Sequence, residues 1–241
     1  MAANEKTHRI ERVAPNTAAK RKSLEDGQQK LSFKRLRTDA RPKPQQRSNM
    51  TKPKDTTPNA EPAKDASGKL QIEEEIGDIF SAPPNTLIIH ACNCEGSWGA
   101  GIAKAFKDRY PAAYGPYVDY CDEHEDNAIG TALLIPPSKD ADEESKHFVG
   151  CLFTSRSKGR KKDSPAKILN ATSPAMEDML KQVKDWNAKA AEGEGEKVGE
   201  VRMCKINSGL FNVPWAKTRL VLEGIDVGDL DVKVIKVVSL D

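Results

Sequence analysis

The strongest constraint on the fold is the stretch 86–107, TLIIHACNCEGSWGAGIAKAFK, where an apolar run precedes a glycine-rich turn and a helical pattern. The run at 87–89 is short, apolar and rich in β-branched residues, which is typical of a buried strand. Gly96, Gly99 and Gly101 follow, and residues without a Cβ let backbone N–H groups approach a bound anion closely. A helix beginning near Ile102 adds unpaired N–H groups and the positive end of its dipole. The stretch therefore predicts a strand, turn and helix able to hold an anion on backbone groups.

Glycines alone do not establish a ligand, because a tight turn between a strand and a helix has the same pattern. The spacing matches neither the P-loop, which needs G-K-[ST], nor the G-x-G-x-x-G dinucleotide fingerprint. Any pocket at this turn is therefore of another kind.

The rest of the body alternates strand patterns with helix patterns. Leu70, Ile72, Glu74 and Ile76 alternate with polar residues, which predicts a strand with one buried face. Further strands are expected at 129–135, 147–154, 201–206 and 232–238. Helices are expected at 102–109 and 114–123. A third helix should start with Ser173 as N-cap and Pro174 at its first position, and a fourth should start at Pro214. This order predicts one α/β domain over residues 69–241, with a largely parallel sheet and helices on both faces.

A second polar, glycine-bearing turn, residues 207–213, also follows an expected strand and precedes an expected helix. Ligands of parallel sheets bind at the carboxyl ends of the strands. We therefore expect the turns at 93–101 and 207–213 to converge on one crevice.

Charge divides the chain into two parts. Residues 1–68 hold 16 Lys and Arg against 8 Asp and Glu, a net charge of +8, so the remaining 22 against 28 give −6. The first part has few apolar residues and is expected to be a disordered basic tail. Its basic clusters at 20–22 and 34–37 fit a bipartite nuclear address, and also an ordinary solvated tail, so contact with nucleic acid or an import receptor is expected of it.

Five cysteines, an odd number, and the lack of an apolar segment at the start predict reduced thiols in an intracellular protein of the cytoplasm or nucleus. No apolar run is long enough to span a bilayer, so no membrane contact is expected.

Four motifs in order give the body a close resemblance to the macrodomain family, the ADP-ribose-binding α/β/α module. They are GDIF at 77–80, HACNCEGSWGAGIA at 90–103, CLFTS at 151–155 and INSGLFNVPW at 206–215. Within that family the body resembles the fungal ADP-ribose 1''-phosphate phosphatases. The resemblance implies a three-layer α/β/α fold with a mixed, largely parallel sheet.

The resemblance also implies the ligand contacts. Asp78 matches the acceptor of the adenine amino group, Asn93 the contact to the distal ribose, and Phe211 the aromatic residue against the ribose. The implied ADP-ribose pocket comprises Gly77, Asp78, Ile79, Ala91, Cys92, Asn93, Trp98, Gly99, Ala100, Gly101, Ile102, Ala103, Asn207, Ser208, Gly209, Leu210, Phe211, Asn212 and Val213.

Three positions depart from the hydrolases of the family that act on ADP-ribosylated proteins. MacroD-type enzymes carry an aspartate where this chain has Ala103, and terminal ADP-ribose glycohydrolases carry one at Phe211 and a lysine near Ser155 or Arg156. Neither apparatus is present, which favours the phosphatase or pure binding.

His90 is the candidate catalytic residue, because imidazole can act as nucleophile or general acid near neutral pH. A histidine bonded inside the strand is the equal alternative. Cys92 and Cys94 are more typical of small buried thiols than of nucleophiles. His90-x-Cys92-x-Cys94 also suggests zinc, but no second ligand pair has finger spacing, so neither a metal nor a cofactor is predicted.

The sequence therefore predicts a monomeric phosphatase that removes the 1''-phosphate from ADP-ribose 1''-phosphate, a by-product of tRNA splicing if the resemblance extends to the pathway. The alternatives are a non-catalytic ADP-ribose reader and an ADP-ribosyl hydrolase acting on modified proteins.

Overall fold

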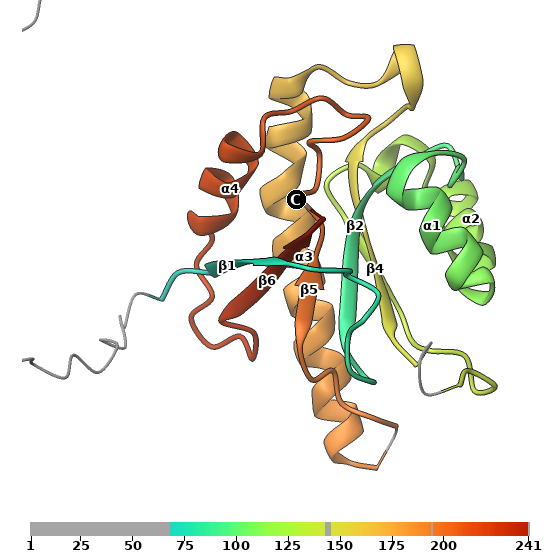
Figure 1. Cartoon of the computed structure of the whole chain (residues 1–241), viewed down its shortest axis with the longest axis vertical. Helices are drawn as coiled ribbons and strands as arrows, with labels where there is room; N and C mark the ends of the chain where they lie inside the picture. Colours follow the sequence, from blue (N-terminus) through green and yellow to red (C-terminus); the bar gives the residue numbers. More distant parts are fainter. Residues whose placement is uncertain (1–67, 143–145, 194, 241) are drawn as a thin grey trace, which may run out of the picture. The chain divides into compact units, whose positions relative to one another are not determined.

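The computed structural model describes residues 68–142, 146–193 and 195–240 (Figure 1). The predicted basic tail lies outside these residues except for Gly68. The strands are β1 (Gln71–Ile76), β2 (Leu87–Asn93), β3 (Ala132–Ile135), β4 (Phe148–Ser155), β5 (Val201–Met203) and β6 (Val234–Ser239). The α-helices are α1 (Gly101–Arg109), α2 (Pro111–His124), α3 (Pro165–Ala191) and α4 (Trp215–Glu223), and the short 3-10 helices are η1 (Glu125–Ala128) and η2 (Gly159–Lys161).

The described strands form one sheet in the order β1-β6-β5-β2-β4-β3. Every neighbouring pair is parallel except β3 and β4, which run antiparallel at one edge. This confirms the predicted mixed, largely parallel sheet. A register shift between Cys92 and Asn93 marks the point where β2 leaves its regular pairing with β4.

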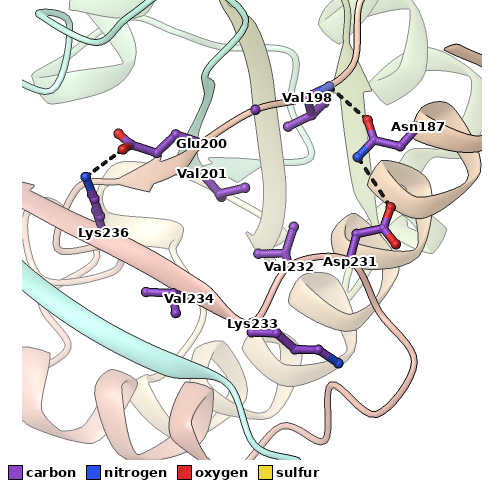
Figure 2. A pocket seen from close by; sticks show the side chains of 10 residues that line it. Asn187, Val198, Glu200, Val201, Asp231, Val232, Lys233, Val234 and Lys236 are labelled. Atoms are coloured by element: carbon purple, nitrogen blue, oxygen red, sulfur yellow. Dashed lines mark hydrogen bonds and ion pairs between the residues drawn. The ribbon is translucent and has the colours of Figure 1, made fainter. Parts of the chain in front are cut away.

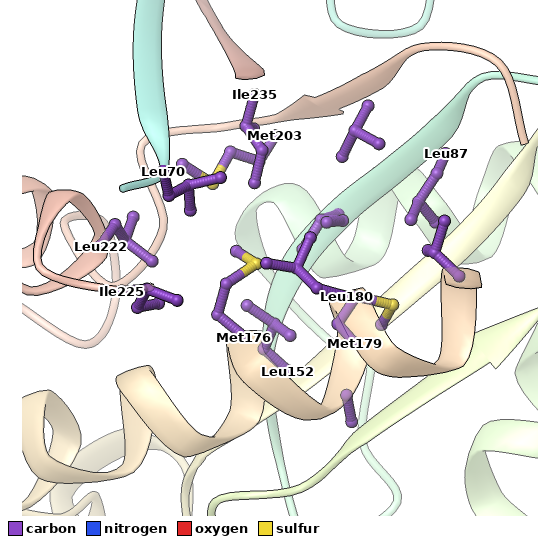
Figure 3. Packing of buried hydrophobic residues seen from close by; sticks show 14 of the residues in the cluster. Leu70, Leu87, Leu152, Met176, Met179, Leu180, Met203, Leu222, Ile225 and Ile235 are labelled. Atoms are coloured by element: carbon purple, nitrogen blue, oxygen red, sulfur yellow. The ribbon is translucent and has the colours of Figure 1, made fainter. Parts of the chain in front are cut away.

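Strand β2 is buried on both faces, and its alternating side chains supply both layers of the core. Leu87 and Ile89 pack into the cluster under α3, whereas Ile88 and Cys92 belong to the cluster under α1 and α2. Figure 3 shows part of the α3 cluster, in which Met176, Met179 and Leu180 lie against strand residues. Figure 1 shows α1 and α2 on one side of β2 and β4, and α3 and α4 on the other. The three-layer α/β/α prediction is thereby confirmed.

Helix α3 begins earlier than the sequence pattern suggested. Its N-cap is Ser164 with Pro165 in the first turn, so the predicted start at Ser173 and Pro174 is wrong. Both serine-proline pairs carry the same start signal. Pro174 is tolerated inside the helix, and its Cγ lies 3.5 Å from the point where a Cβ on Gly130 would be. Although α3 has 27 residues, no helix in the described ranges is both long and apolar enough to cross a bilayer.

The edge strand β1 buries only part of its expected face. Leu70 and Ile72 are buried as predicted, but Ile76 is 79% exposed. The exposed Glu74 side chain accepts hydrogen bonds from Trp215 and Arg219 of α4. The alternating pattern was therefore correct for the strand but wrong for the burial of Glu74 and Ile76, which are both exposed.

Candidate functional site

Four segments after parallel strands line one edge of the sheet. They are residues 77–80 after β1, 94–100 after β2, 156–164 after β4 and 204–214 after β5. Because the strand order is β1-β6-β5-β2-β4, their order along the edge is fixed as 77–80, 204–214, 94–100 and 156–164. Figure 1 shows the loops after β2, β4 and β5 at the top of the view. This is the edge at which parallel sheets bind ligands.

The two predicted turns meet: the glycine loop (residues 93–101) approaches the second loop (residues 204–214), which contains the predicted turn 207–213. Leu210 Cδ1 lies 3.2 Å from the position that a Cβ on Gly101 would occupy. Gly101 also has φ +57°, a conformation that favours glycine. A glycine is therefore needed at 101 both for backbone geometry and for the close approach of the second loop.

Asn93 shapes the start of the glycine loop. Its Nδ2 donates to the Ser97 carbonyl at 2.8 Å, and its Oδ1 accepts from the Glu95 N–H at 2.9 Å. The residue is only 6% exposed. An asparagine amide has a further donor hydrogen and a further lone pair, so it keeps capacity for a ligand hydroxyl.

Two tyrosines of α2 hold the backbone of the same loop, a role that the sequence pattern alone does not reveal. The Tyr117 hydroxyl donates to the Asn93 carbonyl at 2.8 Å and accepts from the Ser97 N–H at 3.0 Å. The Tyr114 hydroxyl donates to the Gly96 carbonyl at 2.9 Å. Their spacing of three was visible in the sequence, but it indicates only a common helix face.

The predicted ligand contacts at 98–103 differ in how exposed their side chains are. Trp98 is 1% exposed and stacks on Tyr117, with ring centroids 4.8 Å apart, so its side chain belongs to the core. The next four residues are exposed and Ala103 is half-buried. Helix α1 starts here with N-cap Ala100, which makes no side-chain cap bond. Its first N–H groups are thus available to an anion.

In the second loop, Asn207 acts as an anchor. It has φ +64°, its Oδ1 accepts from Thr154 Oγ1 at 2.8 Å, and its Nδ2 donates to Thr172 Oγ1 at 3.0 Å. Val213 is also buried, and its N–H donates to the Asn207 carbonyl at 3.0 Å. The residues between them, 208–212, are exposed or half-buried and form the surface of the loop.

At the β1 end, Asp78 is exposed while Ile79 is buried. One oxygen of Asp78 accepts from the Phe80 N–H at 2.9 Å, and the Gly77 N–H donates to the Ser239 carbonyl at 3.0 Å. Exposed Ile76 and Leu240 lie at the carboxyl ends of the paired strands β1 and β6. This end of the edge therefore offers a carboxylate acceptor beside exposed apolar surface.

His90 is fully buried on the α1 side of β2. Its ring stacks on Phe106 with centroids 4.1 Å apart and meets Trp98 edge-on at 4.9 Å. Cys92 is 1% exposed, and Ala91, on the opposite face, packs against the α3 cluster. Of the two interpretations that the sequence left open for His90, this position favours packing inside the strand.

The side chains of the H-x-C-x-C motif do not all come together in the structure. His90 and Cys92 share their cluster with Cys151 of β4, and the potential ligand atoms lie within 4.8 Å of one another. Cys94 is not in the group, because it follows the register shift and its Sγ donates to the Ser155 carbonyl. The grouping is completely buried among aromatic rings, which fits packed thiols better than an accessible metal centre.

We expect the thiols near the edge to react slowly in the folded protein. Burial raises the pKa of Cys94 to about 12 and raises the pKa values of Cys92 and Cys121 above the usual range. The thiolate fraction of Cys94 at pH 8 is then about one in ten thousand, and the thiolate is the reactive form. Mass spectrometry after iodoacetamide should show little alkylation of these three until guanidinium unfolds the chain. Rapid native alkylation of one of them, with loss of activity, would instead identify a nucleophile.

A separate pocket of about 320 Å³ opens at the amino ends of β5 and β6 (Figure 2). Four of its polar side chains pair with one another: Lys236 with Glu200 at 2.6 Å, and Asn187 with Asp231 at 3.4 Å. It lies at the opposite ends of these strands from the predicted ligand contacts, so it does not contribute to the candidate site.

Comparison with known proteins agrees with this geometry. The family model described as "Macro domain" matches residues 89–222. The ADP-ribose 1''-phosphate phosphatase of Chaetomium globosum is 47% identical over 168 residues, covering 68% of this chain and 89% of the relative. The protein of the same name from Aspergillus fumigatus is 42% identical, covering 70% of this chain and 96% of the relative. The solved macrodomain of Thermus aquaticus DarG has a TM-score of 0.53 at 15% identity, covering 70% of this chain and 98% of that one. With the matched region spanning β2 to α4, this chain belongs to the macro domain family.

Proposed function

We propose that this protein binds ADP-ribose 1''-phosphate along the carboxyl edge of its sheet and hydrolyses the terminal phosphate monoester. The observation that carries the proposal is the close approach of the Leu210 side chain to Gly101, which brings two glycine-bearing loops together at one edge of the sheet. Two fungal relatives, 47% and 42% identical to this chain, bear the name of that activity.

The ligand position follows from the exposed groups along the edge. Asp78 accepts from the adenine amino group beside the apolar surface of Ile76. The diphosphate lies between the start of α1 and the surface of the second loop, where N–H groups offset its charge. The distal ribose then reaches Asn93, whose amide has hydrogen-bonding capacity to spare.

In the reaction, a water oxygen bonds to phosphorus while the bond from phosphorus to the 1'' oxygen breaks. The leaving oxygen takes a proton and becomes the 1''-hydroxyl of ADP-ribose. Backbone N–H groups stabilise the charge on the phosphoryl oxygens during this step. We assign the proton on the leaving oxygen to solvent water, because His90 is completely buried. A catalytic role for His90 stays a prediction from the sequence.

The direct test is to incubate the purified full chain with ADP-ribose 1''-phosphate and to measure free phosphate and ADP-ribose. Equal release of the two products is the expected result. Substrate left intact, or products in which the phosphate is still attached to the ribose, would contradict the proposal.

A non-catalytic ADP-ribose reader is the second candidate. Ala103 and Phe211 stand where MacroD-type enzymes and terminal ADP-ribose glycohydrolases, respectively, carry an aspartate, which leaves binding without catalysis open beside the phosphatase. Calorimetric binding of ADP-ribose by a chain that releases no phosphate would identify this function. Release of ADP-ribose from a modified protein would instead indicate a hydrolase.

We also propose that residues 69–241 form the functional domain as a monomer, and that the basic tail contacts nucleic acid or an import receptor. The family match begins at residue 89, within this range. Deleting residues 1–65 is expected to leave cooperative melting, a monomeric mass by light scattering and phosphate release unchanged. Loss of cooperative melting would show that the tail takes part in the fold.

A further inference from the structure

The loop after β4 carries the densest positive charge beside the candidate site. Its residues 156–162, RSKGRKK, hold five cations in seven positions, and we call this segment the basic loop. Part of it forms η2, and α3 begins directly after it. Helix α3 has no side-chain cap bond at Ser164, so the positive end of its dipole adds to the charge of the loop.

The base of this loop is well connected. The Asp163 N–H donates to Ser155 Oγ at 3.0 Å, and Asp163 Oδ2 accepts from the Arg156 N–H at 2.8 Å. The loop is also tied to the glycine loop: the Cys94 N–H donates to the Arg156 carbonyl at 3.1 Å, and Lys158 lies 3.8 Å from a Glu95 oxygen. The two loops therefore keep a defined relative position at the edge.

The cations of the basic loop differ in how far they are neutralised. Arg156 pairs with Asp163 and Lys158 with Glu95. In the described ranges, Arg160, Lys161 and Lys162 make no ion pair within 4.0 Å, and the first two are exposed. A hollow of about 360 Å³ that reaches Arg156 is lined by four acids, Glu95, Asp122, Glu125 and Asp126, which makes it unsuitable for an anion. The uncompensated positive charge thus lies at 160–162.

The order of strands determines which part of the ligand faces this charge. In the proposed orientation, adenine lies at the β1 end and the diphosphate lies between the loops after β5 and β2. The next strand in the same direction is β4, so the distal ribose and any group on its 1'' oxygen point toward the basic loop. A phosphate monoester dianion is the group that Arg and Lys side chains bind best.

We infer that the basic loop is the subsite that recognises the terminal phosphate and distinguishes ADP-ribose 1''-phosphate from ADP-ribose. This rests on the proposed function for the orientation of the ligand. Arg160, Lys161 and Lys162 contact the phosphate, while Arg156 and Lys158 hold the loop in place.

The test compares two full-length triple variants with the same loss of charge. The first is Arg160→Gln, Lys161→Gln, Lys162→Gln, and the control is Lys181→Gln, Lys184→Gln, Lys189→Gln on the exposed surface of α3. For the first variant we expect KM for ADP-ribose 1''-phosphate to rise roughly tenfold or more, and Kd for ADP-ribose to change less than about twofold. Added NaCl should raise KM for the wild type more steeply than for this variant. The control should match the wild type throughout.

Failure of the reaction and failure of the subsite are distinguishable. If the wild type releases no phosphate, competition calorimetry against ADP-ribose still reports whether it prefers the phosphorylated ligand, and loss of that preference in the first variant upholds the subsite. Equal weakening for both ligands, or an unchanged KM, would overturn it. The subsite would also be overturned if the first variant lost binding to a labelled single-stranded RNA while its KM stayed unchanged. The loop would then be a nucleic-acid contact.

Discussion

Replacing Asn93 with alanine is expected to lower the affinity for ADP-ribose by at least about tenfold, or about 1.4 kcal/mol. The substitution removes two hydrogen bonds that close the start of the glycine loop, leaving the Ser97 carbonyl and the Glu95 N–H without these partners. Each such bond is worth about 1 kcal/mol, and the proposed contact to the distal ribose is lost as well. Isothermal calorimetry with ADP-ribose measures the effect.

Asn187→Ala is the matched control for this substitution. Asn187 also uses both ends of its amide, accepting from the Val198 N–H at 2.8 Å and donating to Asp231 at 3.4 Å, but it lines the pocket at the opposite ends of the strands. It should lower the melting temperature to a similar extent and leave affinity unchanged. If Asn93→Ala binds ADP-ribose as tightly as the wild type, the edge is not the ligand site.

Replacing Gly150 with alanine is expected to lower the unfolding free energy by about 1–3 kcal/mol. Gly150 lies in the middle of β4, opposite Ile89. A Cβ there would lie 2.8 Å from Ile89 Cγ1, 3.1 Å from Met179 Cε and 3.2 Å from Leu87 Cδ1. The methionine can move, but the Ile89 side chain is packed between strand and helix, so the core must shift.

Urea unfolding followed by circular dichroism measures this loss, and Gly115→Ala is the control. Gly115 lies inside α2, and apart from its own helix backbone and chain neighbours no heavy atom lies within 4 Å of the added Cβ. Alanine gains helix propensity there, but Pro116 disfavours a Cβ on the preceding helical residue, so the change should alter stability by less than about 1 kcal/mol. Of these two glycine-to-alanine substitutions, only Gly150→Ala should therefore lower the midpoint by the amount expected for a crowded core. An unchanged midpoint for Gly150→Ala would mean that the core under α3 is less tightly packed than described.

The sequence was sufficient to predict the parts of the fold that depend on local pattern. The apolar run before Asn93 and the glycines after it predicted a buried strand, a turn and a helix, and β2 and α1 occupy those places. The convergence of the two loops was also predictable, because both follow strands of one parallel sheet. Local signals failed where two of them competed, as at the start of α3, where Ser164 with Pro165 caps the helix rather than Ser173.

Long-range hydrogen bonds account for most of what the sequence did not reveal. Asn207 bonds to Thr154 and Thr172, partners 53 and 35 residues away, and only the folded sheet brings them together. Likewise, Cys151 joins His90 because β4 pairs with β2 at that position. No spacing rule in one chain specifies such partners, because they depend on strand register.

The Tyr117 hydroxyl bonds to both the Asn93 carbonyl and the Ser97 N–H, and this pair of hydrogen bonds has a consequence for recognition. For the ligand proposed at this edge, these hydrogen bonds should order the loop before binding, so less conformational entropy would be lost on association. Helix α2 is thereby expected to influence the affinity for the proposed ligand through the backbone of the glycine loop. Divergence between related proteins at this tyrosine should consequently alter ligand preference even when every contacting residue is the same.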